Sequence, residues 1–148
     1  MPAGVSFDEP AGRGVEAHDF TAELMDGETV QASELWKDRP LVLVFTASWC
    51  ETCKDVHRTV AEVVGRHEGV ALLGLVPDDD AEGARDYADE LDLGDPLGTA
   101  GDKVWLDYAA REPPVVVLLG PGGTVLRGWP GGVEAAVLDR ELEKLTAR

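Results

Sequence analysis

A pair of cysteines between a buried strand and a helix restricts the fold of this chain more than any other feature of its sequence. Cys50 and Cys53 are the only cysteines among the 148 residues, so all sulfur chemistry must take place at one point. Just before them, the continuous apolar run of residues 41–45 predicts a strand that is buried on both faces. Their spacing along the helix brings both sulfur atoms to one face, close enough for a disulfide bond. Two cysteines are too few for a disulfide-rich scaffold or a four-cysteine zinc site.

Length and charge describe one acidic domain and argue against several classes of partner. The chain has 148 residues, which is the size of a single domain, and 44% of them are hydrophobic. Its 13 Lys and Arg residues against 29 Asp and Glu residues give a formal net charge of −16. Such a charge argues against nucleic acid and anionic membrane surfaces as partners, because both require a basic face. The longest apolar run is far shorter than the roughly 20 residues that span a bilayer.

The spacing of apolar residues predicts an alternation of strands and helices. Strands are expected over residues 20–24, 29–31, 41–45, 70–76, 115–119 and 124–127, and helices over residues 33–36, 50–67, 84–91, 104–108 and 133–145. The acids Asp78, Asp79 and Asp80 precede the third helix and are expected to cap its N-terminus rather than to bind a metal. This order of elements predicts an α/β fold with a mixed central sheet and helices on both faces.

The position of the cysteine pair predicts redox chemistry rather than a static bridge. A thiolate at a helix N-terminus is stabilised by unpaired backbone N–H groups and by the positive end of the helix dipole. Cys50, at the tip of the helix, is expected to attack the disulfide of a partner, and Cys53, sheltered beneath it, to resolve the mixed disulfide. A structural or idle pair is the alternative, but strand, tryptophan, cysteine pair and helix in this order favour the redox interpretation.

The sequence around the cysteines also resembles a known family. The resemblance rests on residues 40–54, which contain the strand, Trp49 and the cysteine pair, and on the segments 17–21, 26–27, 33–35, 104–108, 113–117 and 122–125. These segments are similar to the thioredoxin-like proteins of the TlpA/ResA/DsbE group, over nearly everything after residue 17. The resemblance implies a thioredoxin fold over residues 18–148, with an added N-terminal β-hairpin and a central insertion. Residues 1–17, rich in Gly, Pro, Ala and acids, are expected to form a flexible lead or tether.

The resemblance also implies a groove for a protein substrate. In this group a cis-proline faces the disulfide, and Pro114 matches it because a strand follows directly at Val115. Its missing N–H leaves room for the backbone of a partner to pair alongside. The residue before it, Pro113, departs from the family because it has no N–H with which to hold a substrate backbone. We expect the groove to be formed by Trp49, Glu51, Thr52, Pro113 and Pro114.

Three further departures from the family concern the second cysteine. Val44 occupies the place where thioredoxin has a buried Asp, and Val56 the place where many TlpA-like reductases have a Glu. Arg58 replaces the proline that usually kinks the helix. His57 shares a helix face with both cysteines and is a candidate proton shuttle; a surface or half-buried histidine with a local hydrogen bond is the alternative. With the two cysteines it could instead bind Cu(I), although copper chaperones of the thioredoxin-like class have a longer cysteine spacing.

We expect a thiol–disulfide oxidoreductase that acts on protein thiols or disulfides and needs no bound cofactor or metal. The Glu51 carboxylate opposes a thiolate at Cys50 and therefore favours a reducing couple, although Lys54 can partly cancel its charge. Such a reductant would serve cytochrome c maturation, with apocytochrome c as its substrate, or the disulfides of secreted proteins. It would exchange electrons with an upstream donor or acceptor. Alternatives are an oxidase of secreted proteins, a copper-handling chaperone and a non-catalytic adaptor.

The expected location of the protein in the cell is inferred from the family resemblance and not from a signal peptide. Residues 1–4 lack the basic and apolar segments of a signal peptide. Because the related proteins are exported and often membrane-tethered, we expect an extracytoplasmic monomer whose anchor is absent from this chain. A cytoplasmic protein is the alternative.

Overall fold

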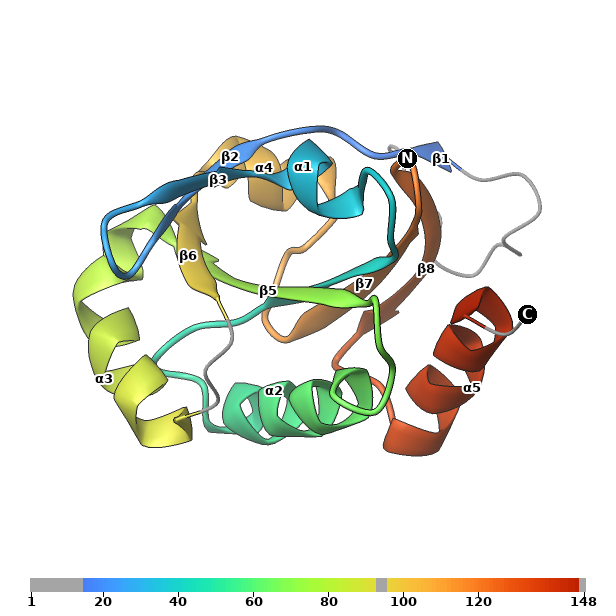
Figure 1. Cartoon of the computed structure of the whole chain (residues 1–148). Coiled ribbons are helices and arrows are strands. Elements are labelled where there is room, and N and C mark those ends of the chain that lie inside the picture. The colour runs from blue at the N-terminus through green and yellow to red at the C-terminus, as the bar shows by residue number, and fades with distance from the viewer. Residues whose placement is uncertain (1–14, 93–95, 147–148) are drawn as a thin grey trace.

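The computed structural model describes residues 15–92 and 96–146, in which strands and helices alternate along the chain (Figure 1). In chain order the elements are β1 (Val15–Glu16), β2 (Thr21–Leu24), β3 (Thr29–Gln31), α1 (Ala32–Trp36), β4 (Leu41–Phe45), α2 (Glu51–Val64), β5 (Ala71–Pro77), α3 (Ala81–Leu91), β6 (Leu97–Ala100), α4 (Asp102–Asp107), β7 (Val115–Gly120), β8 (Thr124–Pro130) and α5 (Ala135–Thr146). A short 3₁₀ turn, Asp78–Asp80, joins β5 to α3.

One eight-stranded sheet runs through the described part of the molecule, in the order β1-β8-β7-β4-β5-β6-β2-β3. Its central strand β4 is parallel to β5 and antiparallel to β7. Every residue of β4 is buried, as its continuous apolar run predicts, because both faces of the sheet are covered. This mixed sheet confirms the predicted α/β thioredoxin fold. The β2–β3 pair supplies the added N-terminal hairpin, and α3 with β6 forms the central insertion.

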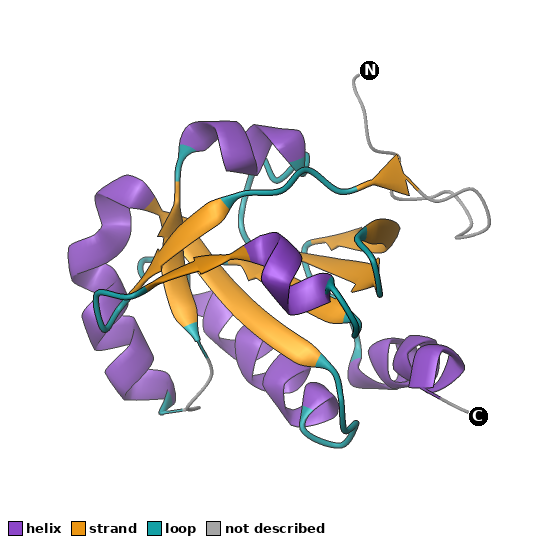
Figure 2. Cartoon of the chain, turned by 45° about the horizontal axis from the view of Figure 1, so that its top comes forward, coloured by secondary structure: helices purple, strands orange, loops and turns teal. Residues whose placement is uncertain are grey.

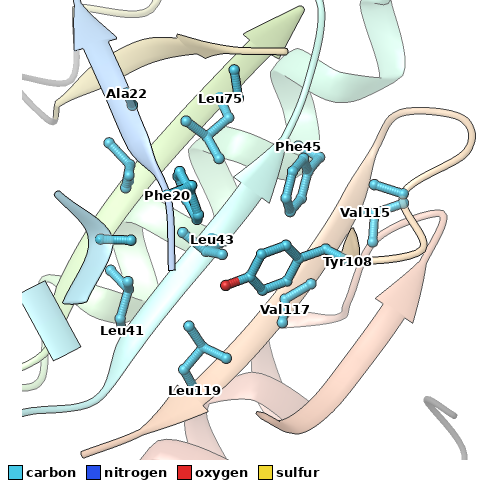
Figure 3. Close-up of a cluster of buried hydrophobic side chains, with 14 of the residues drawn as sticks. Phe20, Ala22, Leu41, Leu43, Phe45, Leu75, Tyr108, Val115, Val117 and Leu119 are labelled. Carbon is cyan, nitrogen blue, oxygen red and sulfur yellow. The ribbon is translucent and has the colours of Figure 1, made fainter. Parts of the chain in front are cut away.

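Helices cover both faces of the sheet, and each face has its own core (Figures 1 and 2). On one face, α2 and α5 pack against Val42 and Val44 of β4. On the other face, α1, α4 and the N-terminal hairpin enclose Leu43, Phe45 and the ring of Tyr108 (Figure 3). This division arises because successive residues of a strand point to opposite faces of the sheet. The strand that leads to the cysteines, β4, is therefore packed on both faces.

Two of the strands were not expected from the sequence. β6 pairs in parallel with β5 and carries the β2–β3 hairpin on its other edge. It is short and contains Gly98, so its apolar pattern is too weak to predict a strand. β1 pairs with β8 although Val15 and Glu16 fall within the expected lead, and the rest of that lead, residues 1–14, lies outside the described residues. Within the described part of the chain, none of the helices is both long and apolar enough to cross a membrane.

Candidate active site

Cys50 and Cys53 form a disulfide between the end of β4 and the start of α2, with their Cα atoms 5.3 Å apart. Cys50 is the N-cap residue of α2, and its Sγ accepts a hydrogen bond from the Cys53 N–H at 3.2 Å. This N–H is one of the donors that a helix N-terminus leaves without an intrahelical partner. It therefore points at the sulfur that would carry negative charge after reduction. Cys50 is half-buried and Cys53 is fully buried, so only the first sulfur is open to a partner.

The loop before Cys50 is held by the turn that precedes α3. The Asp80 carboxylate accepts the Ser48 N–H at 2.7 Å and the Ser48 hydroxyl at 2.6 Å. Gly83 in α3 permits this approach, because a Cβ at that position would overlap with the Ser48 hydroxyl. Asp80 is the N-cap residue of α3, as expected, but its side chain makes no capping hydrogen bond to the helix, because the carboxylate accepts its hydrogen bonds from Ser48.

Lys54 lies between two carboxylates beside the cysteine pair. Its Nζ is 2.9 Å from Glu90 Oε1 of α3 and 3.1 Å from Glu51 Oε2. The hydrogen bonds to Glu90 and Glu51 raise the pKa of Lys54, so the ammonium is charged at neutral pH. Glu51 and Thr52, the two residues between the cysteines, are exposed. Lys54 thus offsets part of the negative charge of Glu51, but it shares its own charge with Glu90.

His57 follows Cys53 by one helical turn on the buried face of α2, and its ring is turned toward α3. The residue is only 3% exposed. Its Nδ1 lies 2.9 Å from the Tyr87 hydroxyl, which in turn lies 2.7 Å from the hydroxyl of Thr46. Burial lowers the pKa of His57 to about 4 and raises the pKa of Tyr87 to about 12, so both side chains are uncharged at neutral pH. The side chains of His57, Tyr87 and Thr46, from α2, α3 and the loop after β4, therefore form a chain of hydrogen bonds.

The far edge of the His57 ring lies against the sheet. Its Nε2 is buried and has no hydrogen-bond partner among the described residues. A Cβ on Gly74 of β5 would be 2.8 Å from His57 Cε1 and 3.3 Å from Nε2, so the missing side chain of Gly74 makes room for the imidazole. Gly74 pairs in register with Val44, the position at which thioredoxin has its buried Asp. Val56 does not share this space, because its side chain packs against Gly132.

The proline segment expected to face the disulfide precedes β7. The peptide bond between Pro113 and Pro114 is cis. Pro114 is buried, and its carbonyl accepts the Gly131 N–H at 2.8 Å, which ties the segment to the end of β8. Pro113 is half-buried. Because neither proline has an N–H, a partner's backbone can pair with this segment only through its carbonyl groups.

An open groove of about 580 Å³ lies beside the prolines. Its lining is formed by Ala109, Arg111, Glu112, Pro113, Val115, Pro130 and Gly131. Trp49, which was expected to form one wall of the substrate groove, does not contribute to this lining. Its side chain is 69% exposed, in the position directly before Cys50. The indole is thus available to a partner instead of shielding the sulfur atoms.

Cys50, Cys53 and His57 are not arranged as a metal site. Over residues 15–92 and 96–146, no three His, Cys, Asp or Glu side chains are grouped so that they could hold a metal ion. The Nδ1 of His57 is occupied by the Tyr87 hydroxyl and is therefore not free to bind a metal ion. The geometry therefore gives no support to the copper-binding alternative.

Several residues around the cysteines were not identified from the sequence. These are Thr46, Ser48, Asp80, Tyr87 and Glu90. Tyr87 fits the apolar face of α3 by its spacing, and nothing local distinguishes its hydroxyl from that of an ordinary core tyrosine. A hydroxyl-bearing residue directly after a buried strand, as at Thr46, is the only sequence signal that could have indicated the cluster.

Comparison with known proteins supports the resemblance noted in the sequence. The model of the AhpC/TSA family matches residues 14–126. The thiol:disulfide interchange protein DsbE of Escherichia coli K12 is 27% identical over 132 residues, which cover 85% of this chain and 69% of DsbE.

Solved structures agree with this match. The structure of MTB DsbF in its mixed oxidised and reduced forms is 25% identical and superposes with a TM-score of 0.76, covering 86% of this chain and 95% of DsbF. A secreted Mycobacterium tuberculosis disulfide oxidoreductase homologous to E. coli DsbE shares the fold, with a TM-score of 0.71 at 20% identity over 85% of this chain and 96% of its own.

Proposed function

This chain belongs to the AhpC/TSA family and is a thiol–disulfide oxidoreductase of the thioredoxin fold, and we propose that it works as a reductant of protein disulfides. Cys50 is the nucleophile that attacks the partner, and Cys53 is the thiol that resolves the mixed disulfide. The pair needs no bound cofactor, since the electrons reside in the two thiols themselves.

The observation that carries this proposal is the unequal environment of the two sulfurs. Cys50 is half-buried at the helix tip, where its Sγ accepts the Cys53 N–H, whereas Cys53 is fully buried. A partner can therefore reach only Cys50, whose thiolate is stabilised by the helix N-terminus. Cys53 remains protected until the mixed disulfide has formed. Trp49 and the Pro113–Pro114 segment flank this opening as the surface for the polypeptide that carries the substrate sulfur.

The direction of electron flow is argued from charge. The Glu51 carboxylate follows Cys50 directly and destabilises a thiolate there, which makes the dithiol form a better reductant. Lys54 opposes this effect, but its ammonium also contacts Glu90. The charges of Glu51, Lys54 and Glu90 sum to −1, which favours a reducing couple. Its reduction potential should lie closer to the thioredoxin value of about −270 mV than to the DsbA value of about −120 mV.

The partners we propose are proteins outside the cytoplasm. Apocytochrome c and secreted proteins with incorrect disulfides both present cysteine pairs that need a reductant. An extracytoplasmic location agrees with the resemblance to the TlpA/ResA/DsbE group and with a compartment in which disulfides persist. An upstream dithiol donor must then restore the reduced pair after each turnover.

The reduction potential of the Cys50–Cys53 couple tests this function. The protein is equilibrated in redox buffers of dithiothreitol or glutathione and its thiols are trapped by alkylation. A reversible two-electron transition below about −220 mV supports the reductant, and a transition above about −180 mV would make the protein an oxidase. The Cys53→Ser variant, which retains the accessible thiol, is the control and should show no two-electron transition. If the native pair shows none in metal-free protein, disulfide exchange is excluded.

A further inference from the structure

The His57 ring is positioned to serve the buried cysteine. His57 follows Cys53 by one turn on the buried face of α2, and side chains on a helix lean toward its N-terminus, which here means toward the cysteine. The edge that carries Nε2 lies over Gly74, next to Val44 in the register of the sheet. The ring therefore lies between α2, α3 and the sheet, one helical turn from Cys53.

Of the two ring nitrogens of His57, only Nε2 is free to accept a proton. Tyr87 occupies Nδ1 at 2.9 Å, whereas Nε2 is buried without a partner among the described residues. An unpaired buried polar atom costs free energy and calls for a functional explanation. We propose that His57 takes the proton of the Cys53 thiol, through one bridging water, when this thiol attacks the mixed disulfide, and returns it in the reverse step. This inference rests on the proposed function of the cysteine pair.

The step balances as follows for a partner disulfide. The Cys50 thiolate breaks the partner's S–S bond and forms a mixed disulfide, and the first partner sulfur leaves. The Cys53 thiol then transfers its proton through the bridging water to His57 Nε2, and the resulting thiolate attacks Cys50 Sγ. The bond between Cys50 and the partner breaks, and the second partner sulfur leaves as a thiolate that is protonated by solvent. Two electrons have passed to the partner, and the imidazolium finally loses its proton to water.

Tyr87 and Thr46 orient the ring for this role. For Nε2 to accept a proton, Nδ1 must carry the ring hydrogen and donate it to the Tyr87 oxygen. Tyr87 then donates its own hydrogen to the Thr46 oxygen, 2.7 Å away. The hydroxyl of Tyr87 can do so at neutral pH because burial holds the phenol in its protonated form. Tyr87 is thus a positioning residue that selects the tautomer, not a group that touches the sulfur.

The electrostatic surroundings permit the transfer. With the disulfide closed, burial lowers the pKa of His57 to about 4, so the ring is neutral and its lone pair is free. A thiolate formed beside the ring would raise the pKa of the imidazole, because opposite charges stabilise each other in a buried site. The contacts of the ring come from Tyr87 of α3 and Gly74 of β5; the charges that act on the Tyr87 hydroxyl are Lys54, Arg58 and Glu90.

The two sulfurs can be followed separately with the coloured disulfide reagent dithiobis(nitrobenzoate). The reduced protein releases a first thiolate when Cys50 attacks the reagent and a second when Cys53 resolves the mixed disulfide. We expect His57→Gln and His57→Leu to slow the second phase by about 100-fold at pH 7 and to leave the first phase within about twofold. Tyr87→Phe should slow the second phase by roughly tenfold. In the His57 variants the second phase should rise about tenfold per pH unit, as expected for an unassisted thiol.

The control is His67→Gln, the same substitution in the turn that follows α2, where the native histidine contacts Asp139. Both phases should be unchanged in that variant. A folded His57→Gln or His57→Leu protein whose second phase stays within about threefold of the native rate, or whose two phases slow equally, would overturn the role of His57. Failure of disulfide exchange by the cysteine pair differs, because the native protein itself would then release no second thiolate, and failure of the reductant role appears separately as a reduction potential above about −180 mV. If the leucine variant does not fold, the glutamine variant decides.

Discussion

Asp80 accepts two hydrogen bonds from Ser48, one from its backbone N–H and one from its hydroxyl, and Ser48 stands two residues before Cys50. The contact joins the central insertion to the loop that presents the accessible sulfur. Tyr87 and Glu90 make two more contacts of the same kind, to Thr46 and Lys54. The insertion therefore contacts the residues that flank the redox pair on either side.

Loss of the Asp80 carboxylate should destabilise the protein. We expect Asp80→Ala to lower the free energy of unfolding by about 1–3 kcal/mol, because it leaves both Ser48 donors without their charged acceptor. Asp80→Asn keeps one acceptor oxygen and should cost less. Urea unfolding of the disulfide form measures both. The neighbouring Asp79 is exposed, so Asp79→Ala should stay within about 0.5 kcal/mol, and an equal loss in the two alanine variants would contradict the assignment.

The charges beside Cys50 should shift the reduction potential in opposite directions. Glu51→Gln removes a carboxylate that opposes the thiolate, so the potential should become less negative by about 10–20 mV. Lys54→Gln removes the compensating ammonium, so the potential should become more negative. Equilibration with glutathione buffers measures both. Glu62→Gln, at an exposed position farther along α2, should leave the potential unchanged. Shifts of the same sign for Glu51 and Lys54 would contradict this account.

Burial of neutral His57 should make stability depend on pH. The pKa of His57 is lowered to about 4 in the folded protein, from 6.5, so the unfolded chain binds the proton first as the pH falls. The stability contributed by this group is therefore present above pH 6.5 and is lost as the pH falls toward 4. Between pH 7 and pH 5 the loss should be about 2 kcal/mol.

The comparison with His57→Gln isolates this effect from other titrating groups. Urea unfolding of the oxidised native protein and of the variant is measured at both pH values. The native protein should lose about 2 kcal/mol more than the variant between them. Identical pH dependence in the two proteins would show that His57 is not held neutral.

The exposed indole of Trp49 should matter for partners and not for the fold. We expect Trp49→Ala to leave the free energy of unfolding within about 0.5 kcal/mol. It should lower kcat/KM for a protein disulfide by about tenfold while leaving the rate with dithiobis(nitrobenzoate) unchanged, because only a polypeptide can cover the indole. Leu106 is similarly exposed, at 72%, but lies on α4, so Leu106→Ala is the matched control. Equal losses from the two variants would remove Trp49 from the partner surface.

The parts of the site that sequence predicts are those whose signals are local. The apolar run of β4, the spacing of the cysteines and the amphipathic pattern of α2 lie within residues 41–64 and together specify strand, loop and helix. The single-face packing of α2 follows from its periodicity. For this reason the location and unequal burial of Cys50 and Cys53 could be anticipated.

The contacts of His57 with Gly74 and Tyr87 could not be predicted, because they join segments that are distant in the sequence. The periodicity of α2 places His57 on the buried face but does not say which way its ring turns. That orientation depends on the absence of a side chain at Gly74 and on the Tyr87 hydroxyl, which is 30 residues away in the sequence. Asp80 illustrates the same limit, since a carboxylate before a helix predicts a cap unless a loop elsewhere in the fold supplies stronger donors.

The pairing of β1 with β8 gives the molecule a polarity. Val15 lies opposite Val125, β8 continues the register to Leu119 of β7, and Leu119 lies opposite Leu41, the residue of β4 farthest from the cysteines. Val15 therefore joins the sheet at the end that lies away from Cys50. β1 is thus held at the opposite end of the sheet from Trp49 and the accessible sulfur, and a polypeptide can approach these two residues without displacing it.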